Sequence, residues 1–172
     1  MLLFHTARFV KKPLWQTLGA HGLLTPLQSP YRDTSMELAM KAWLNGGIVD
    51  WMEARVSPLS QSFNRASAVF EVMGIVPAAN GTALVCLDEH VDRFFSSAER
   101  TFMAIPFTRE EIKAAIVETA RANSVKNGIA KFYAYYSDID VGPVTPRDVS
   151  VAVFCLDYGM LGVNPDKYSA PV

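Results

Sequence analysis

Few residues of this sequence have the types and spacing that catalysis or metal binding requires. His5, His21 and His90 lie far apart and lack the spacing of metal ligands, so we expect no metal site. Cys86 and Cys155 each lie in an apolar run and form no CxxC pair, which predicts two buried thiols and a reducing, cytoplasmic setting. The sequence also lacks the patterns of P-loop, GxGxxG, GxSxG and HExxH proteins.

The other candidates for chemistry are cationic side chains, which bind anions. Arg93 is expected near the start of a helix but off its apolar stripe, so it points either into a cleft beside the sheet or into solvent. Lys131 lies within an aromatic-rich segment, and Arg65 lies in a polar one without periodicity. A guanidinium group presents a planar fork of donors, whereas a lysine amine acts as a point charge. We therefore assign no catalytic residue and treat these cations as candidates for anion binding.

The stretch 67–100 is predicted to contain the elements that position Arg93. Residues 67–76 and 82–87 are apolar runs of strand length, separated by turn-forming residues. A helix is expected to follow with Asp88 as its cap. Its apolar face recurs at three- and four-residue spacing and comprises Val91, Phe94, Phe95, Ala98 and Phe102.

The remaining segments predict one more main helix and several strands. Thr108 and Glu111 form a capping box that opens the helix at 108–123. Strand signals lie at 129–136 and 149–156, with a hairpin at 40–50 and a further short strand at 53–57. Because the strands cluster around two adjacent helices instead of alternating with them, we predict an α+β fold with a largely antiparallel sheet.

The composition limits the classes of partner. The chain carries a formal charge of −1 without runs of like charge, which argues against nucleic acid and anionic membranes. Half of the residues are hydrophobic, which suggests an apolar surface covered by a second domain or a partner. We divide the sequence into an N-terminal extension at 1–39, a domain at 40–158 and a linker at 159–172.

A series of short motifs resembles a known family. Phe70-Glu71 precedes Leu87-Asp88-Glu89-His90, and Arg93 and Ser97-Ala98 follow at fixed spacing. Together with the hairpin and the later strands, this order resembles the amino-terminal small domain of class IV aminotransferases that use pyridoxal phosphate (PLP). The family includes branched-chain and D-amino acid aminotransferases and aminodeoxychorismate lyase. The resemblance covers approximately residues 42–158.

The resemblance implies roles for four residues. Arg93 matches the arginine that contacts the PLP phosphate, and Phe70 matches an aromatic that lines the substrate pocket, although plain core packing is an equal alternative. Lys131 stands where many branched-chain members have an arginine, and it can still attract a substrate carboxylate. Arg65-Ala66 replaces the Tyr-Gly of many members, so Arg65 is either a second carboxylate contact or an exposed loop residue. Glu71 is either solvent-facing or part of an ion pair.

The resemblance also implies a reaction. We expect amino-group transfer between an amino acid, possibly branched-chain, and a 2-oxo acid, in a homodimer. The family's Schiff-base lysine lies in a second domain, and none of the seven lysines here matches it, so we expect this chain alone to be inactive. We also expect Arg93→Ala to leave the fold nearly intact. The alternatives are an aminodeoxychorismate lyase-type enzyme and a non-catalytic dimerisation or binding domain.

Overall fold

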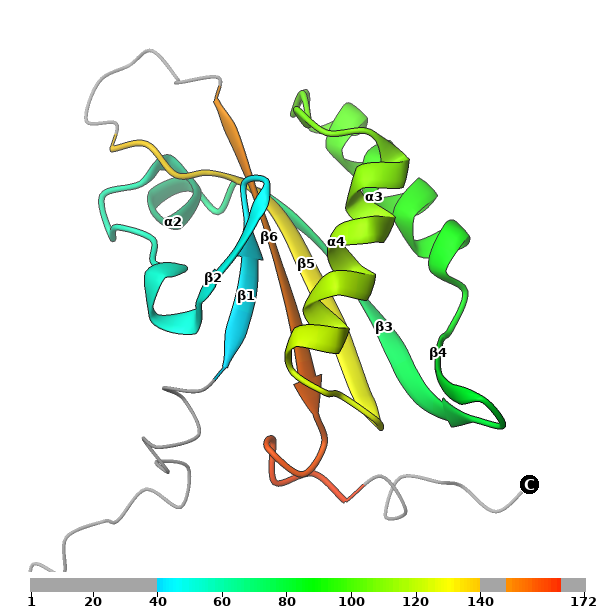
Figure 1. Cartoon of the computed structure of the whole chain (residues 1–172). Helices are drawn as coiled ribbons and strands as arrows, with labels where there is room; N and C mark the ends of the chain where they lie inside the picture. The colour runs from blue at the N-terminus through cyan, green and yellow to red at the C-terminus, as the bar shows by residue number, and fades with distance from the viewer. Residues whose placement is uncertain (1–39, 140–147, 165–172) are drawn as a thin grey trace, which may run out of the picture. The chain divides into compact units, whose positions relative to one another are not determined.

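A computed structural model describes residues 40–139 and 148–164, which lie within Tyr31–Val172, one of two compact units of the chain. They form a six-stranded sheet in the order β2-β1-β6-β5-β3-β4, and every pair of neighbours is antiparallel (Figure 1). This arrangement confirms the predicted α+β fold. The strands are β1 (Lys41–Leu44), β2 (Gly47–Asp50), β3 (Ala68–Ala78), β4 (Gly81–Leu84), β5 (Gly128–Tyr136) and β6 (Val149–Asp157). The expected extension at 1–39 and the last residues of the linker lie outside the described residues.

The predicted hairpin at 40–50 is confirmed by β1 and β2. Asn45 and Gly46 make the turn with φ values of 47° and 111°, the left-handed region that asparagine and glycine tolerate best. The Asn45 side chain then donates to Ser150 Oγ and accepts from the Val151 amide, at 3.2 and 2.8 Å. The turn is therefore fastened to β6, the central strand to which β1 pairs.

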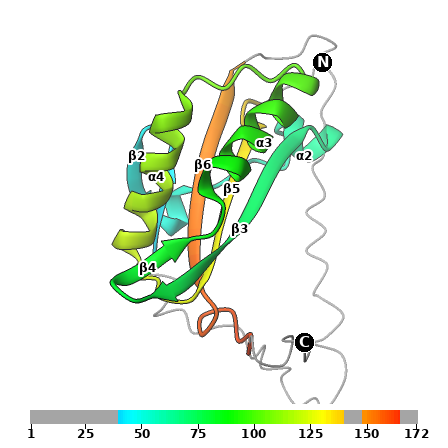
Figure 2. The same ribbon diagram turned by 90° about the vertical axis from the view of Figure 1, so that its right-hand side faces the viewer.

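Two helices, α3 (Leu87–Arg100) and α4 (Arg109–Ala122), cover one face of the sheet (Figures 1 and 2). The capping box of Thr108 and Glu111 is present as predicted. Phe94 and Phe132 are fully buried and meet edge to face with ring centroids 4.9 Å apart. The inward face of α4 comprises the buried residues Ile112, Ala115, Ile116 and Thr119. The main hydrophobic core of the described residues therefore lies between the covered face of the sheet and the two helices.

The start and end of α3 differ from the prediction. Asp88 is not the cap, because Cys86 occupies that position in a left-handed conformation (φ 50°) and Asp88 in the first turn pairs instead with Lys113 of α4 at 2.5 Å. This turn also leaves Cys86 exposed, so only Cys155 is a buried thiol. The helix ends before Phe102, which is 93% exposed and does not extend the apolar face.

Two further segments depart from their predicted form. The strand expected at 53–57 is absent from the described residues, and the chain instead forms a 3-10 turn, η2 (Trp51–Glu53), followed by α2 (Gln61–Arg65). Gly128, which precedes the strand predicted at 129–136, starts β5 and is needed for close strand approach. A Cβ atom there would lie 1.9 Å from the Leu156 carbonyl oxygen of β6.

Candidate functional site

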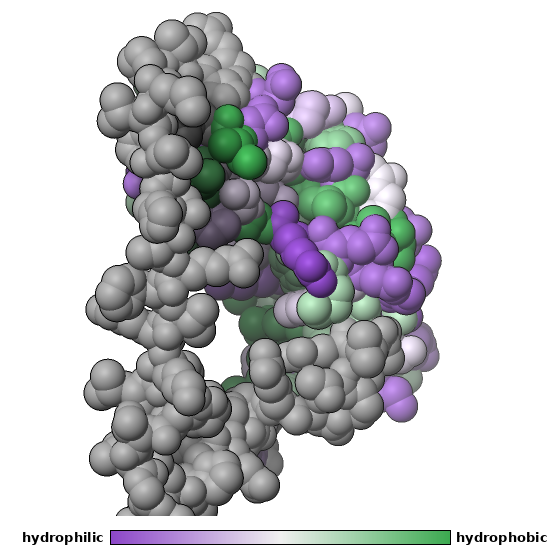
Figure 3. Space-filling view, turned by 90° about the vertical axis from the view of Figure 1, so that its left-hand side faces the viewer, coloured by the Kyte–Doolittle hydropathy of each residue, from purple (hydrophilic) through white to green (hydrophobic). Residues whose placement is uncertain are grey.

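The face of the sheet away from α3 and α4 carries a separate set of side chains. Alternate residues of a strand point to opposite faces, so Phe70 of β3 and Lys131 and Tyr133 of β5 lie on this open face, while their neighbours Glu71 and Phe132 lie on the covered one. Figure 3 views the molecule from the open side, where hydrophobic surface is interrupted by hydrophilic groups. The two faces of the same strands therefore differ in chemistry.

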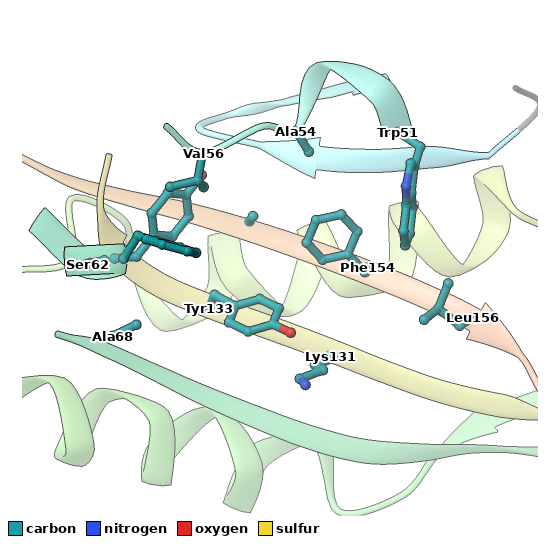
Figure 4. Close-up of a pocket in the computed structure, with 12 residues that line it drawn as sticks. Trp51, Ala54, Val56, Ser62, Ala68, Lys131, Tyr133, Phe154 and Leu156 are labelled. Carbon is teal, nitrogen blue, oxygen red and sulfur yellow. The ribbon is translucent and has the colours of Figure 1, made fainter. Parts of the chain in front are cut away.

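A largely apolar pocket of about 430 Å³ lies on this open face. Its floor is the sheet, and η2, α2 and the segment between them supply the opposite wall (Figure 4). Lys131 is the one cationic side chain among its lining residues, which are Trp51, Ala54, Val56, Ser62, Phe63, Ala68, Lys131, Tyr133, Tyr135, Ala152, Phe154 and Leu156. Burial raises the pKa of the Tyr135 phenol, which therefore stays neutral. Such a pocket suits an apolar group attached to an anion.

Aromatic rings hold the Lys131 amine at the pocket. Its Nζ atom lies 4.9 Å from the ring centroid of Phe70 and 5.2 Å from that of Tyr133. These are cation–π distances, and the two rings are cross-strand neighbours on β3 and β5. Phe70 is 57% exposed, so it is not a core residue of the described structure. The structure thus brings together two of the four predicted site residues, Phe70 and Lys131.

Arg93 lies on the other side of β3, where it forms an ion pair with Glu71. Its Nε and Nη2 atoms donate to Glu71 Oε1 and Oε2 at 2.7 and 2.6 Å, and His90 Nδ1 lies 3.0 Å from Oε2. Glu71 is only 5% exposed, and burial alone would raise the pKa of its carboxyl group. Hydrogen bonds and charge from Arg93 and His90 outweigh burial and lower that pKa. Of the two alternatives for Glu71, the ion pair is confirmed.

The four predicted site residues therefore do not share one cavity. β4 pairs only with residues Ile75–Ala78 of β3, so the first half of β3 is a strand edge among the described residues. Phe70 and Glu71 are adjacent and point to opposite sides of this edge, so the pocket residue Lys131 lies beside Phe70 on one side and Arg93 binds Glu71 on the other. Arg65 ends α2, close in sequence to the pocket residues Ser62 and Phe63, but it does not line the pocket itself.

The sequence contained a signal for several site residues that we did not single out. Tyr133 and Tyr135 follow Lys131 at a period of two, which places all three on one face of β5. Phe154 is the cross-strand partner of Lys131. Trp51 carried no such signal, because it reaches the pocket from a turn that the sequence did not predict; its ring lies 4.8 Å from that of Phe154.

Two kinds of feature are absent from the part of the chain that the structure describes. No helix at 40–139 or 148–164 is long and apolar enough to cross a membrane. Within the same residues, no three His, Cys, Asp or Glu side chains are grouped as they would be around a metal ion.

Comparison with known proteins places these features in a family. The model of the family "Amino-transferase class IV" matches residues 68–167. A branched-chain-amino-acid aminotransferase of Pseudomonas aeruginosa is 30% identical over 100 residues, which are 58% of this chain and 33% of that protein. The crystal structure of a branched-chain aminotransferase from Thermoproteus uzoniensis with norvaline is 33% identical with a TM-score of 0.65, covering 69% of this chain and 40% of that one.

A second similar structure was solved in complex with a phosphopyridoxyl compound. The T.th. branched-chain amino acid aminotransferase, complexed with N-(5'-phosphopyridoxyl)-L-glutamate, is 35% identical to this chain with a TM-score of 0.59. The match covers 67% of this chain and 40% of that one. The chain thus spans about a third of the curated relative's length and 40% of each of these two structures.

Proposed function

The chain belongs to the class IV aminotransferase family, and we propose that it forms the small-domain part of a PLP-dependent enzyme that transfers an amino group from a branched-chain amino acid to a 2-oxo acid. The observation that carries this proposal is the pocket on the open face, where a single lysine amine stands among apolar and aromatic side chains. A branched aliphatic side chain suits the apolar lining, and a substrate carboxylate suits the amine.

Arg93 fits the phosphate of PLP. One edge of its guanidinium binds Glu71, Nη1 has no hydrogen-bond partner among the residues at 40–139 and 148–164, and the side chain is 63% exposed. A guanidinium edge with free donors matches two phosphate oxygens. When bound, PLP acts as an electron sink for the bonds at the substrate's α-carbon. A ligand that crosses the β3 edge would place its phosphate at Arg93 and its amino acid part beside Phe70.

Each candidate site residue of this chain then has a specific role in binding. Phe70 and the pocket aromatics exclude water and contact the substrate side chain. Lys131 attracts the carboxylate as a point charge, and Arg65 is a second candidate for that contact. No lysine of this chain takes the role of the covalent, proton-transferring lysine. Exposed apolar side chains on the open-face side of the sheet, among them Phe63 and Phe70, support a homodimer or a domain contact. The two free cysteines are consistent with a cytoplasmic location.

The experiment compares the native protein with the 172-residue chain alone. The native protein is expected to transfer the amino group of leucine or valine to 2-oxoglutarate in the presence of PLP, and the chain alone is expected to show no transfer. Transfer by the native protein from neither branched-chain donor would contradict the proposal. Release of pyruvate and an aromatic amine from aminodeoxychorismate would support the lyase alternative instead.

A further inference from the structure

Glu71 is a buried carboxylate that two side chains of α3 approach. Arg93 binds both of its oxygens, at 2.7 and 2.6 Å, and His90 lies 3.0 Å from Oε2 and 3.2 Å from Arg93 Nη2. Two other acidic residues of α3 have other partners, since Asp88 pairs with Lys113 and Asp92 with Arg109. Among the described residues, Glu71 is the carboxylate that pairs with Arg93.

The geometry of this pair fixes the direction of the guanidinium. The group is planar, so binding the Nε and Nη2 edge to a carboxylate also sets where Nη1 points. Glu71 itself is held by β3 and is almost inaccessible, whereas Arg93 is mostly exposed. The Arg93 side chain is thereby preorganised as a donor, so ligand binding has a smaller entropic cost for ordering it.

The ion pair of Glu71 and Arg93 also has an electrostatic effect, which opposes phosphate binding. The negative charge of Glu71 cancels the positive charge of Arg93 and on its own weakens attraction of an anion. If charge balance were the role of Glu71, its removal would strengthen phosphate binding. If positioning is its role, removal weakens it. The two roles therefore differ in the sign of one measurement.

We infer that Glu71 is a positioning residue that orients Arg93 toward the cofactor phosphate. This inference rests on the function proposed above, because it takes PLP as the ligand and Arg93 as its phosphate contact. His90 supports the arrangement by contacting the Glu71 oxygen that Arg93 Nη2 also uses. In this arrangement Arg93 would join the carboxylate to the phosphate, and the carboxylate itself would contact neither the substrate nor the cofactor.

The test measures dissociation constants of PLP and of pyridoxal, which lacks the phosphate, for the native protein freed of cofactor. The variants are Glu71→Gln, Arg93→Ala and the double substitution, and each is melted without ligand. We expect Glu71→Gln to raise the PLP constant about five- to tenfold and to leave the pyridoxal constant unchanged. Arg93→Ala should raise the PLP constant at least tenfold, and the double variant should match Arg93→Ala, because Glu71 acts only through Arg93.

The possible results separate the inference from its premise. If Arg93→Ala weakens PLP binding while Glu71→Gln leaves it unchanged or strengthens it, the positioning role is overturned and the phosphate contact stands. Equal losses for PLP and pyridoxal in Glu71→Gln would show a structural disturbance and also overturn the inference. If Arg93→Ala binds PLP like the parent, the assignment of Arg93 itself fails.

Discussion

The two faces of the sheet are built from alternate residues of the same strands, yet they serve different ends. On the covered face, Phe132 and its neighbours pack against α3 and α4, and the one buried carboxylate among the described residues, Glu71, has its charge matched. On the open face, Tyr133 and Lys131 line a pocket of about 430 Å³, Phe70 lies beside Lys131, and all three side chains remain partly accessible. The hydrophobic core therefore lies on one face and the proposed substrate pocket on the other, and the predictions below test that division.

The largest effect is expected from two phenylalanines on opposite faces. Phe132→Ala empties a fully buried position beside Phe94 and should lower the free energy of unfolding by about 3–5 kcal/mol. Phe70→Ala removes a half-exposed ring and should cost less than about 1.5 kcal/mol, while weakening substrate binding. Chemical denaturation of both variants provides the measurement. Equal losses would show that the open face is also part of the core.

Substitution of the ion pair on the covered face is expected to be asymmetric. Arg93→Ala leaves the buried Glu71 carboxylate without its main partner, and an unsatisfied buried acceptor costs on the order of 1–3 kcal/mol. The ion pair thus changes our expectation that this substitution leaves the fold nearly intact. Glu71→Gln should cost less, because the arginine left behind is exposed. The double variant should be more stable than Arg93→Ala alone; if it is less stable, desolvation of Glu71 is not the cause.

The same carboxylate predicts a dependence on pH. The pKa of Glu71 is lowered in the folded state from 4.5, so its contribution to stability is complete above pH 4.5 and is lost as the pH falls through the folded pKa. The pKa values of Glu111 and Asp157 are lowered too, so the parent loses stability in acid for several reasons. Denaturation from about pH 6 to about pH 3 should show a smaller acid loss in Glu71→Gln. Parallel curves for parent and variant would show that Glu71 does not contribute to the loss of stability in acid.

Two lysines test the open face. Lys131→Met removes the amine at the pocket and should raise the KM of the carboxylate substrate about tenfold in the native protein, as expected for loss of one charge-assisted contact. Lys113→Met is the matched control, because Lys113 lies on α4 and pairs with Asp88 and Glu110. An unchanged KM in Lys131→Met, or an equal rise in both variants, would exclude a specific role for the pocket lysine.

Much of the fold was predictable because its signals are local. The three- and four-residue spacing of Val91, Phe94 and Ala98 identified the buried face of α3, and the spacing of Thr108 and Glu111 identified the cap of α4. The error at Asp88 has a tertiary cause. Its carboxylate pairs with Lys113 on another helix, and no property of the segment itself shows this.

The candidate site was harder to predict for a related reason. Alternation along β3 and β5 separates Phe70 from Glu71 and Lys131 from Phe132, but it does not say which face the helices cover. The pocket also depends on Trp51 and on Phe154, which lie far apart in the sequence. Side chains such as His90 and Glu71 are likewise brought together only by the packing of α3 on β3.

The smallest effect concerns Ala66, which follows α2 beside the pocket. Ala66 is exposed and adopts φ 52° and ψ 36°, a left-handed conformation that is costly for alanine and not for glycine. Many class IV aminotransferases carry Tyr-Gly at the position of Arg65-Ala66, which fits this backbone. Ala66→Gly should therefore raise the free energy of unfolding by about 0.5–1 kcal/mol, the gain in the folded state exceeding the added entropy of the unfolded chain. The control is Ala114→Gly at an exposed position in the middle of α4, where glycine should cost about 1 kcal/mol. Denaturation curves that move in the same direction for both variants would show that the left-handed turn at Ala66 is unstrained.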